Sequence, residues 1–319
     1  MLRSFFIALS KATWAQRLIT RWKFAWSVAS RFIAGETSVE AICAVERLNQ
    51  AGILATLDHL GENTSSLQEA EQATLDVLEI LERIEKNGVQ SNVSIKLSQL
   101  GLTIDEEQCR KNLLRIFEKA SQSGNFIRID MEDASLTDKT LEILEWAHAS
   151  GYPRVGIVIQ SYLYRSQTDV RKLLQSTTKI RLVKGAYKES AQVAYPAKKD
   201  VDENFDRLLD DMLDAVVRLG EPYSTGDGRI PPIPAVATHD IHRIDYARKA
   251  LENRGLPKDA LEFQMLYGIR RDLQELLVRE GYPVRVYVPY GTHWYPYFMR
   301  RLAERPANVW FFISNFFHK

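Results

Sequence analysis

The stretch VGIVIQSYLYRSQTDVRKLLQSTTKIRLVKGAY, residues 155–187, shows in one place the pattern that organises the whole chain. It begins with an apolar run, Val155–Ile159, continues through an amphipathic segment, Gln167–Leu174, and reaches a second apolar run, Ile180–Val183. Short runs rich in Val, Ile and Leu have the length and composition of strands that are buried on both faces of a parallel sheet. The stretch therefore predicts a strand–helix–strand unit.

The same alternation continues through the chain from about residue 50. The apolar runs predict eight strands: Ile53–Leu57, Val93–Leu97, Phe126–Ile129, Val155–Ile159, Ile180–Val183, Pro234–Ala237, Leu261–Leu266 and Val284–Val288. The segments between them predict helices: Ser66–Lys86, Asp105–Ser121, Thr137–His148, Gln167–Leu174, Asp202–Arg218, Ile241–Asn253 and Ile269–Glu280. Glycines follow several of these helices, where they fit a left-handed helix end: Gly88, Gly124, Gly151, Gly255 and Gly281.

Eight such units match the size of a (β/α)8 barrel, which typically has ~250 residues. The alternative is an open, doubly wound sheet, which usually carries a glycine-rich phosphate turn after an early strand. The chain contains neither a GxGxxG motif nor a Walker loop. We therefore expect a (β/α)8 barrel.

Composition excludes several other classes of protein. The 319 residues are 45% apolar and 26% charged, as in an ordinary globular protein. The formal net charge of +1 provides no overall field that would hold a nucleic acid. Cys43 and Cys109 lie far apart and outside any CxxC motif, so we interpret them as ordinary thiols of a reducing compartment.

Residues 1–34 differ from the rest of the chain. They contain six basic residues and no acidic one, together with Trp14, Trp22 and Trp26. Apolar residues recur there at helical spacing, but no run is long enough to span a bilayer. A basic, tryptophan-rich amphipathic helix suits a membrane surface. Packing on the main domain or on a second subunit is the alternative. We treat residues 1–34 as amphipathic N-terminal helices and residues 35–319 as a single barrel domain.

Polar or ionisable residues stand at the end of every predicted strand, which is where barrel enzymes gather their chemistry. In chain order they include Asp58, Glu62, Lys96, Asp130, Gln160, Arg181, Lys184, Thr238, His239, Gln264 and Tyr287. Lys96, Asp130 and Arg181 interrupt otherwise apolar runs, and burying a charge without a partner is costly. The pattern over eight strands favours an enzyme.

The segment after the last strand predicts a site for an anion. Tyr297, Arg300, Arg301 and Glu304 share one face of a helix. Two adjacent guanidinium groups repel each other unless an anion lies between them, and paired arginines bind a carboxylate well. A solvated helix face with an Arg300–Glu304 pair is the alternative. Together with the tyrosines, the pattern favours a small anionic substrate.

These residues also carry a family resemblance. The chain, from about residue 35 to residue 315, resembles the monofunctional bacterial proline dehydrogenases. The motifs RLVKGAY (residues 181–187) and YVPYGTH (residues 287–293) are the most specific, and the latter is followed by the helix that contains Arg300 and Arg301. Shorter matching pieces lie at the other strand ends in the expected order: LGE (60–62), IKL (95–97), RIDME (128–132), QSY (160–162) and ATHD (237–240).

The resemblance implies roles for the residues at the strand ends. Asp130 and Arg181 would lie at the reactive edge of an FAD cofactor, with Arg181 near its N5 atom. Arg300 and Arg301 would bind the carboxylate of L-proline. The other substrate-site residues would be Lys96, Tyr287, Tyr297, Glu304 and Glu62, the last pairing with Arg300. The FAD itself would be held by Met131, Gln160, Arg181, Lys184, Gly185, Ala186, Tyr187, Thr238 and His239. The resemblance also implies a distorted barrel whose eighth helix sits over the strand ends.

The implied reaction oxidises L-proline to Δ1-pyrroline-5-carboxylate, the first step of proline catabolism, by hydride transfer from C5 of proline to N5 of FAD. The electrons would pass to a membrane quinone. The protein would then be cytoplasmic and peripheral on the inner face of the cell membrane, and it would contact lipid through residues 1–34.

Two other functions stay open from the residues alone. Lys96 or Lys184 could form a Schiff base, as in barrel aldolases, or the barrel could be a non-catalytic module that binds a membrane surface. We expect no metal, because His239 and His242 form an HxxH pair without a third ligand.

Overall fold

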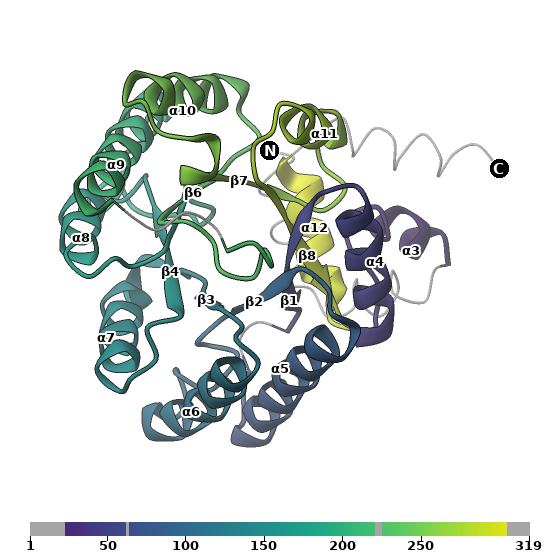
Figure 1. Cartoon of the computed structure of the whole chain (residues 1–319). Helices are drawn as coiled ribbons and strands as arrows, with labels where there is room; N and C mark the ends of the chain where they lie inside the picture. The colour runs from purple at the N-terminus through teal and green to yellow at the C-terminus, as the bar shows by residue number, and fades with distance from the viewer. Residues whose placement is uncertain (1–22, 62–63, 221–224, 305–319) are drawn as a thin grey trace.

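The predicted strands form a closed parallel barrel (Figure 1). The computed structural model describes residues 23–61, 64–220 and 225–304. Within these ranges the strands follow one another around the barrel in chain order, and β8 pairs back to β1. They are β1 (Leu54–His59), β2 (Ser91–Ile95), β3 (Ile127–Ile129), β4 (Val155–Gln160), β5 (Ile180–Val183), β6 (Pro234–Ala237), β7 (Glu262–Leu266) and β8 (Val284–Tyr290). The prediction of a (β/α)8 barrel is confirmed.

Helices surround the barrel as the sequence pattern predicts (Figure 1). They are α5 (Leu67–Asn87), α6 (Glu106–Gln122), α7 (Thr137–Ala149), α8 (Ser166–Leu173), α9 (Lys198–Leu219), α10 (Ile241–Asn253) and α11 (Arg271–Arg279), with 3-10 turns at Ala134–Leu136 and Lys258–Ala260. The largest disagreement is at α9, which begins at Lys198 instead of Asp202. Its first turn is polar and shows no apolar periodicity, so the pattern placed the start too late.

The ends of α5 show why local sequence located the helices well. Ser66 caps the N-terminus by accepting a hydrogen bond from the backbone N–H of Glu69 at 3.2 Å. Gly88 ends the helix with φ +64°, in the left-handed region that glycine adopts without a steric penalty. One face of α5 is buried, including Val77, Ile80 and Leu81. Both ends and the buried face are therefore readable from sequence alone.

The outer ring is completed by a helix that the sequence pattern did not locate. Helix α4 (Ser38–Gln50) precedes the barrel and packs against β1, β8 and α5. Figure 1 shows it between α5 and α11, in the position that the helix after β8 fills in a regular barrel. A capping box begins α4: Glu40 N–H donates to the Thr37 hydroxyl, and the Glu40 carboxylate accepts from Thr37 N–H.

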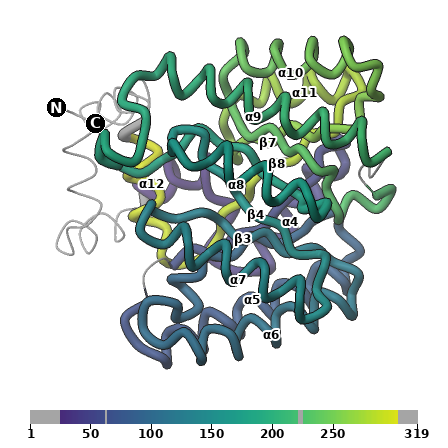
Figure 2. The backbone as a smooth tube through the Cα atoms, turned by 90° about the vertical axis from the view of Figure 1, so that its left-hand side faces the viewer, coloured from purple at the N-terminus to yellow at the C-terminus, as the bar shows by residue number. Residues whose placement is uncertain are grey.

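The helix that follows β8 lies at the end of the barrel instead of in the ring. Figure 2 shows α12 (Trp294–Glu304) at one end of the barrel, and α12 packs on Leu60, after β1, and on Ile269, after β7. The prediction of an eighth helix over the strand ends is confirmed. Helix α3 (Lys23–Ala29), from Ala25 onward, and the segment that follows it pack on α12. Together they form an apolar cluster that is separate from the main core of the barrel. The division of the chain at residue 34 stays a prediction.

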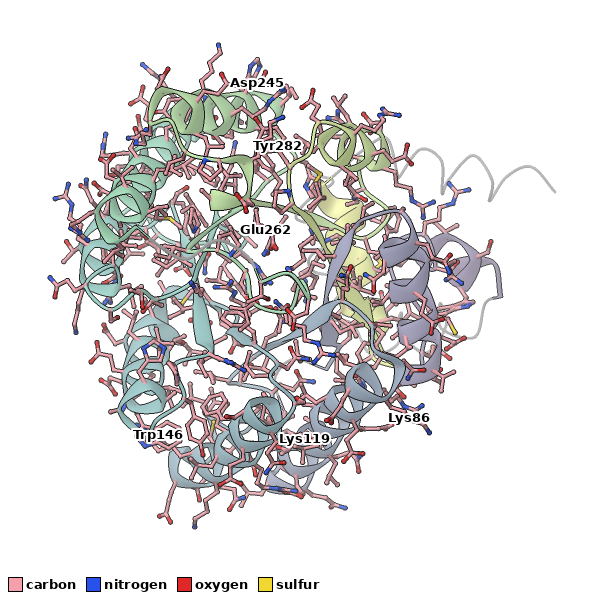
Figure 3. The ribbon with its side chains drawn as sticks, in the orientation of Figure 1. Lys86, Lys119, Trp146, Asp245, Glu262 and Tyr282 are labelled. Atoms are coloured by element: carbon pink, nitrogen blue, oxygen red, sulfur yellow. The ribbon has the colours of Figure 1, made fainter. Side chains whose placement is uncertain are left out.

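The inside of the barrel is unusually polar. Fully or almost fully buried polar side chains point inward from the strands, and they include Thr56, Asp58, Ser94, Arg128, Arg181, Glu262, Gln264 and Arg285. Figure 3 shows Glu262 within the ring of strands. Because charged groups are rarely buried without partners, we expect the charged members of this set to have partners inside the barrel.

Candidate active site

Four side chains predicted from the strand ends meet at the carboxyl end of the barrel. The ammonium group of Lys96 lies 2.8 Å from Oδ1 of Asp58 and 3.4 Å from Oδ2 of Asp130. It also donates a hydrogen bond to the Tyr287 hydroxyl at 3.1 Å, and that hydroxyl donates to Oδ2 of Asp130 at 2.8 Å. We call Asp58, Lys96, Asp130 and Tyr287 the buried cluster. It joins β1, the ends of β2 and β3, and β8 into one site.

Arg181 is held on the other side of Asp130. Its Nη1 donates to Oδ1 of Asp130 at 2.9 Å and to the Ser94 hydroxyl at 3.1 Å, and its Nε donates to Oε1 of Gln264 at 2.5 Å. The guanidinium carbon lies 5.3 Å from the centre of the Tyr287 ring, within the range of a cation–π contact. Asp130 thus bridges two cations in a nearly dry environment.

Burial changes the acidity of two members of the buried cluster. Removal from water raises the pKa of Asp58 to about 6; the charge of Lys96 opposes this shift and that of Asp130 adds to it. Burial, followed by the negative charges of Asp130 and Asp58, raises the pKa of Tyr287 well above its ordinary value. The Tyr287 hydroxyl therefore keeps its proton at neutral pH and remains a donor to Asp130.

Helix α12 brings the predicted anion-binding residues over the strand ends. Tyr297 is buried, whereas Arg300 and Arg301 are half-buried. The Arg301 guanidinium carbon lies 5.2 Å from the centre of the Tyr297 ring, within the range of a cation–π contact. Glu62 and the side chain of Glu304 lie outside the described residues, so their predicted roles stay predictions.

The predicted flavin-binding residues lie on or directly after β3, β4, β5 and β6. Met131 and Gln160 are buried, whereas Gly185, Ala186 and Tyr187 form an exposed segment. Lys184 is ion-paired with Asp202 at 2.5 Å and with Asp240 at 2.6 Å. These loops follow neighbouring strands, so they form one side of the carboxyl end.

Two further residues of these loops are fixed by hydrogen bonds. The Thr238 hydroxyl accepts from Asp240 N–H at 3.1 Å. Nε2 of His239 accepts from Leu266 N–H at 3.0 Å, so Nε2 carries no proton and Nδ1 is the ring nitrogen that can carry one.

Several residues of this region were not given roles from sequence. Glu132 accepts hydrogen bonds from the Ser98 backbone N–H, at 2.9 Å, and from the Ser98 hydroxyl, which ties the loops after β2 and β3 together.

Glu262 and Arg285 form a fully buried, two-pronged ion pair lower in the barrel. Their signal in the sequence is a charged residue within an apolar strand, the same signal that located Lys96, Asp130 and Arg181.

Among the described residues no group of His, Cys, Asp and Glu side chains is arranged to hold a metal ion. In the same part of the chain, no helix has both the length and the apolar character needed to cross a membrane.

Fold and site together define a (β/α)8-barrel enzyme, with a buried acid–base cluster covered by a helix that carries paired arginines. Comparison with known proteins assigns the family: residues 41–313 match the model of the proline dehydrogenase family, and the chain belongs to that family. The chain is 40% identical to proline dehydrogenase 1 of Bacillus subtilis over the full length of both. It is 45% identical to the proline dehydrogenase of Deinococcus radiodurans, over 91% of this chain and 90% of the relative.

A solved structure agrees with this assignment. The fold is similar to that of proline utilization A (PutA) from Bdellovibrio bacteriovorus, with a TM-score of 0.78 and 28% identity. The match covers 88% of this chain and 33% of the PutA chain, so the chain corresponds to about a third of that protein. By family, the chain is an oxidoreductase of proline catabolism.

Proposed function

We propose that the protein oxidises L-proline to Δ1-pyrroline-5-carboxylate with FAD as its cofactor. The observation that carries the proposal is the arrangement of the buried cluster and Arg181 beneath α12, in a chain of the proline dehydrogenase family. The substrate combines one carboxylate with a small apolar ring, which matches a site built from cations and tyrosines.

The residues at the ends of β4 and β5 fit a flavin. Gln160 is buried, and its amide nitrogen donates to the carbonyl oxygen of Glu132 at 2.7 Å. Its Oε1 has no hydrogen-bond partner among the described residues, so it is poised to accept from an N–H group of a ligand. At Gly185, φ is +126° and a Cβ atom would stand 2.5 Å from the Tyr162 ring, so only glycine allows the exposed 185–187 segment to follow β5 in this conformation. We therefore infer that this side of the barrel holds the cofactor.

The substrate side of the site follows from charge. Arg300 and Arg301 on α12 would bind the carboxylate of proline, with Lys96 beside them and Tyr287 and Tyr297 against the ring. Several cations around the substrate favour the neutral form of its amine, and only that form has the lone pair needed to release hydride from C5. Helix α12 covers the site and excludes water. A fixed orientation of the reactants lowers the barrier by ~7 kcal/mol.

When bound, FAD supplies the two-electron acceptor that no protein side chain provides. The chain supplies charge and position around it: Arg181, fixed by Asp130, places a cation at the reactive edge of the site, while Lys184, Thr238, His239 and the 185–187 segment would hold the rest of the cofactor together with Met131 and Gln160.

The Schiff-base alternative is less favourable in this geometry. Two carboxylates surround Lys96 and two others surround Lys184. Either lysine would have to break two ion pairs before its nitrogen could attack a carbonyl carbon, as formation of a Schiff base requires.

An anaerobic visible spectrum of the purified protein, before and after addition of L-proline, tests the proposal. A flavin spectrum that bleaches with proline is the expected result. A flavin that does not bleach would reject proline as the substrate. Absence of flavin after incubation with FAD, combined with covalent trapping of substrate by borohydride, would replace the proposal with the Schiff-base mechanism.

We further propose that a membrane quinone takes the electrons and that the N-terminal segment brings the protein to the inner face of the membrane. Residues 1–34 carry six basic residues and no acid. Their last part, including Ala25, Val28 and Phe32, is buried against α12. The lipid-binding part would therefore lie within residues 1–22.

Removal of this part retains Ala25, Val28 and Phe32, the described residues that pack with α12. Deletion of residues 1–22 should preserve reduction of a soluble dye by proline and weaken both binding to anionic lipid vesicles and reduction of vesicle-borne quinone. Unchanged vesicle binding by the truncated protein would reject a membrane role for the segment.

A further inference from the structure

We propose that Gln264 and Glu262 are positioning residues that fix the guanidinium group of Arg181 in its working orientation. The proposal rests on the function proposed above, in which Arg181 lies at the reactive edge of the site. It concerns a series of hydrogen bonds inside the barrel, which we call the hydrogen-bond series. The series runs from Asp130 through Arg181, Gln264 and Glu262 to Arg285.

The hydrogen-bond series is continuous and shielded from solvent. Nε of Arg181 donates to Oε1 of Gln264 at 2.5 Å, and the Gln264 amide nitrogen donates to Oε1 of Glu262 at 2.6 Å. Arg285 grips both oxygens of Glu262, at 2.8 and 2.9 Å. Glu262 and Arg285 have no exposed surface, and Gln264 is 3% exposed. Figure 3 shows Glu262 inside the ring of strands, away from the outer helices.

Arg285, the last residue of the hydrogen-bond series, is fixed by hydrogen bonds to the backbone. Arg285 donates to the carbonyl oxygen of Ala55 on β1 and to that of Gly228, before β6, both at 2.6 Å. Its side chain therefore cannot turn without breaking bonds to two separate segments of backbone. Glu262 is fixed in turn, because its two oxygens are matched to the fork of Arg285.

The order of donors and acceptors gives the amide of Gln264 one possible orientation. Nε of Arg181 can only donate, and an ionised Glu262 can only accept. The amide must therefore turn its oxygen toward Arg181 and its nitrogen toward Glu262. The flipped amide would place two donors together at one end and two acceptors at the other, in a site without water to relieve them.

The consequence for Arg181 is a fixed plane. Asp130 and Ser94 accept hydrogen bonds from Nη1, and Gln264 accepts one from Nε. A guanidinium bound only through Nη1 can rotate about that contact, whereas one bound through both Nη1 and Nε cannot. A group preset in this way stabilises developing charge without a cost of reorganisation during the reaction.

The test compares two glutamines of equal burial. Gln264→Met removes the acceptor for Arg181 with little change in side-chain length. Gln274→Met is the matched control: Gln274 is also 3% exposed, but its amide nitrogen donates only to backbone, at Ile269 (2.8 Å) and Leu266 (3.3 Å). Both variants lose a buried amide, so both should lower the thermal midpoint by similar amounts.

Only the Gln264 variant should change the chemistry. We expect Gln264→Met to lower kcat for proline about tenfold or more, with a much smaller change in KM. The midpoint potential of the bound flavin should also become more negative, because the nearby cation is no longer held in place. Equal kcat values and equal flavin potentials in the two variants would overturn the proposal. Failure of the unaltered protein to oxidise proline would instead refute the proposed function.

Gln264→Glu provides a second variant of nearly unchanged volume. Between Arg181 and Glu262, the new carboxyl reproduces the native pattern only when protonated, with its O–H donating to Glu262 and its carbonyl oxygen accepting from Arg181. Its kcat, relative to that of the unaltered protein, should therefore rise as the pH falls from 8 to 6. A constant ratio over this range would count against the proposal even if Gln264→Met does not fold.

Discussion

Replacing Tyr287 with phenylalanine removes one oxygen atom from the centre of the buried cluster and leaves its other members in place. The hydroxyl donates to Oδ2 of Asp130 at 2.8 Å and accepts from Nζ of Lys96 at 3.1 Å. The ring lies 5.3 Å from the guanidinium carbon of Arg181 and 5.8 Å from Nζ of Lys96. A phenylalanine ring keeps both cation–π contacts, so the variant isolates the hydrogen bonds of the hydroxyl.

The expected magnitude follows from what remains. A hydrogen bond to a charged group contributes ~1.5–3 kcal/mol. Asp130 keeps Arg181 at 2.9 Å and Lys96 at 3.4 Å, so its carboxylate is not left without partners and the lower half of that range applies. We expect the free energy of unfolding to fall by about 2 kcal/mol. In a domain of this size that corresponds to a thermal midpoint lower by roughly 3 °C.

Thermal unfolding followed by circular dichroism measures the effect, and the same strand supplies the control. Tyr290 is also buried on β8, and its hydroxyl has no hydrogen-bond partner among the described residues. Tyr290→Phe should therefore cost little or nothing. Equal decreases in the midpoints of the two variants would refute the reasoning, because the loss would then come from the change of ring and not from the contacts to Asp130 and Lys96.

The remaining predictions concern three other parts of the molecule. Arg301→Lys should raise the proline KM about tenfold or more, because the two-pronged grip on a carboxylate is lost; the flavin content should not change, and an unchanged KM would argue against the carboxylate clamp. Gly268→Ala should loosen the segment after α3, because a Cβ atom there would stand 1.7 Å from the Arg31 carbonyl oxygen at a φ of +74°; limited proteolysis near residue 31 measures this, and unchanged protection would contradict it. Burial alone would raise the pKa of Asp240, but its hydrogen bond and charge contact with Lys184 lower it to about 2. This contribution to stability is present above pH ~4 and is lost as the pH falls toward 2, so Asp240→Asn should make acid unfolding less steep between pH 4 and 2, and an identical titration curve would exclude the contribution.

Local sequence was sufficient for most of the barrel. Each strand end falls within two residues of its predicted position. Strands that are buried on both faces need continuous apolar runs, and such runs are easily recognised in the sequence. The helix ends followed from caps such as Ser66 and Gly88, whose effect is confined to a few residues.

Helix α4 shows what such local reading misses. Its capping box and its apolar face, with Ala41, Ile42 and Val45, are present in the sequence. The alternation that predicted the barrel begins after α4, so the pattern gave no reason to place a helix in the ring. Helix α4 can occupy this place in the ring only because α12 lies over the strand ends instead. That arrangement is a property of the assembled barrel.

The sequence by itself determined which residues stand at the strand ends, because the period of the strands and the positions of their polar interruptions are fixed along the chain. It also placed Arg300 and Arg301 on one face of a helix. The tertiary structure alone decided how these residues pair: Lys96 lies between Asp58 and Asp130, and Arg181 rests on Gln264. Such contacts join residues more than thirty positions apart, and they exist only once parallel register and closure of the barrel bring the strands together. Burial then removes water as a competing partner, so each charge has to be satisfied by the neighbours that the fold supplies.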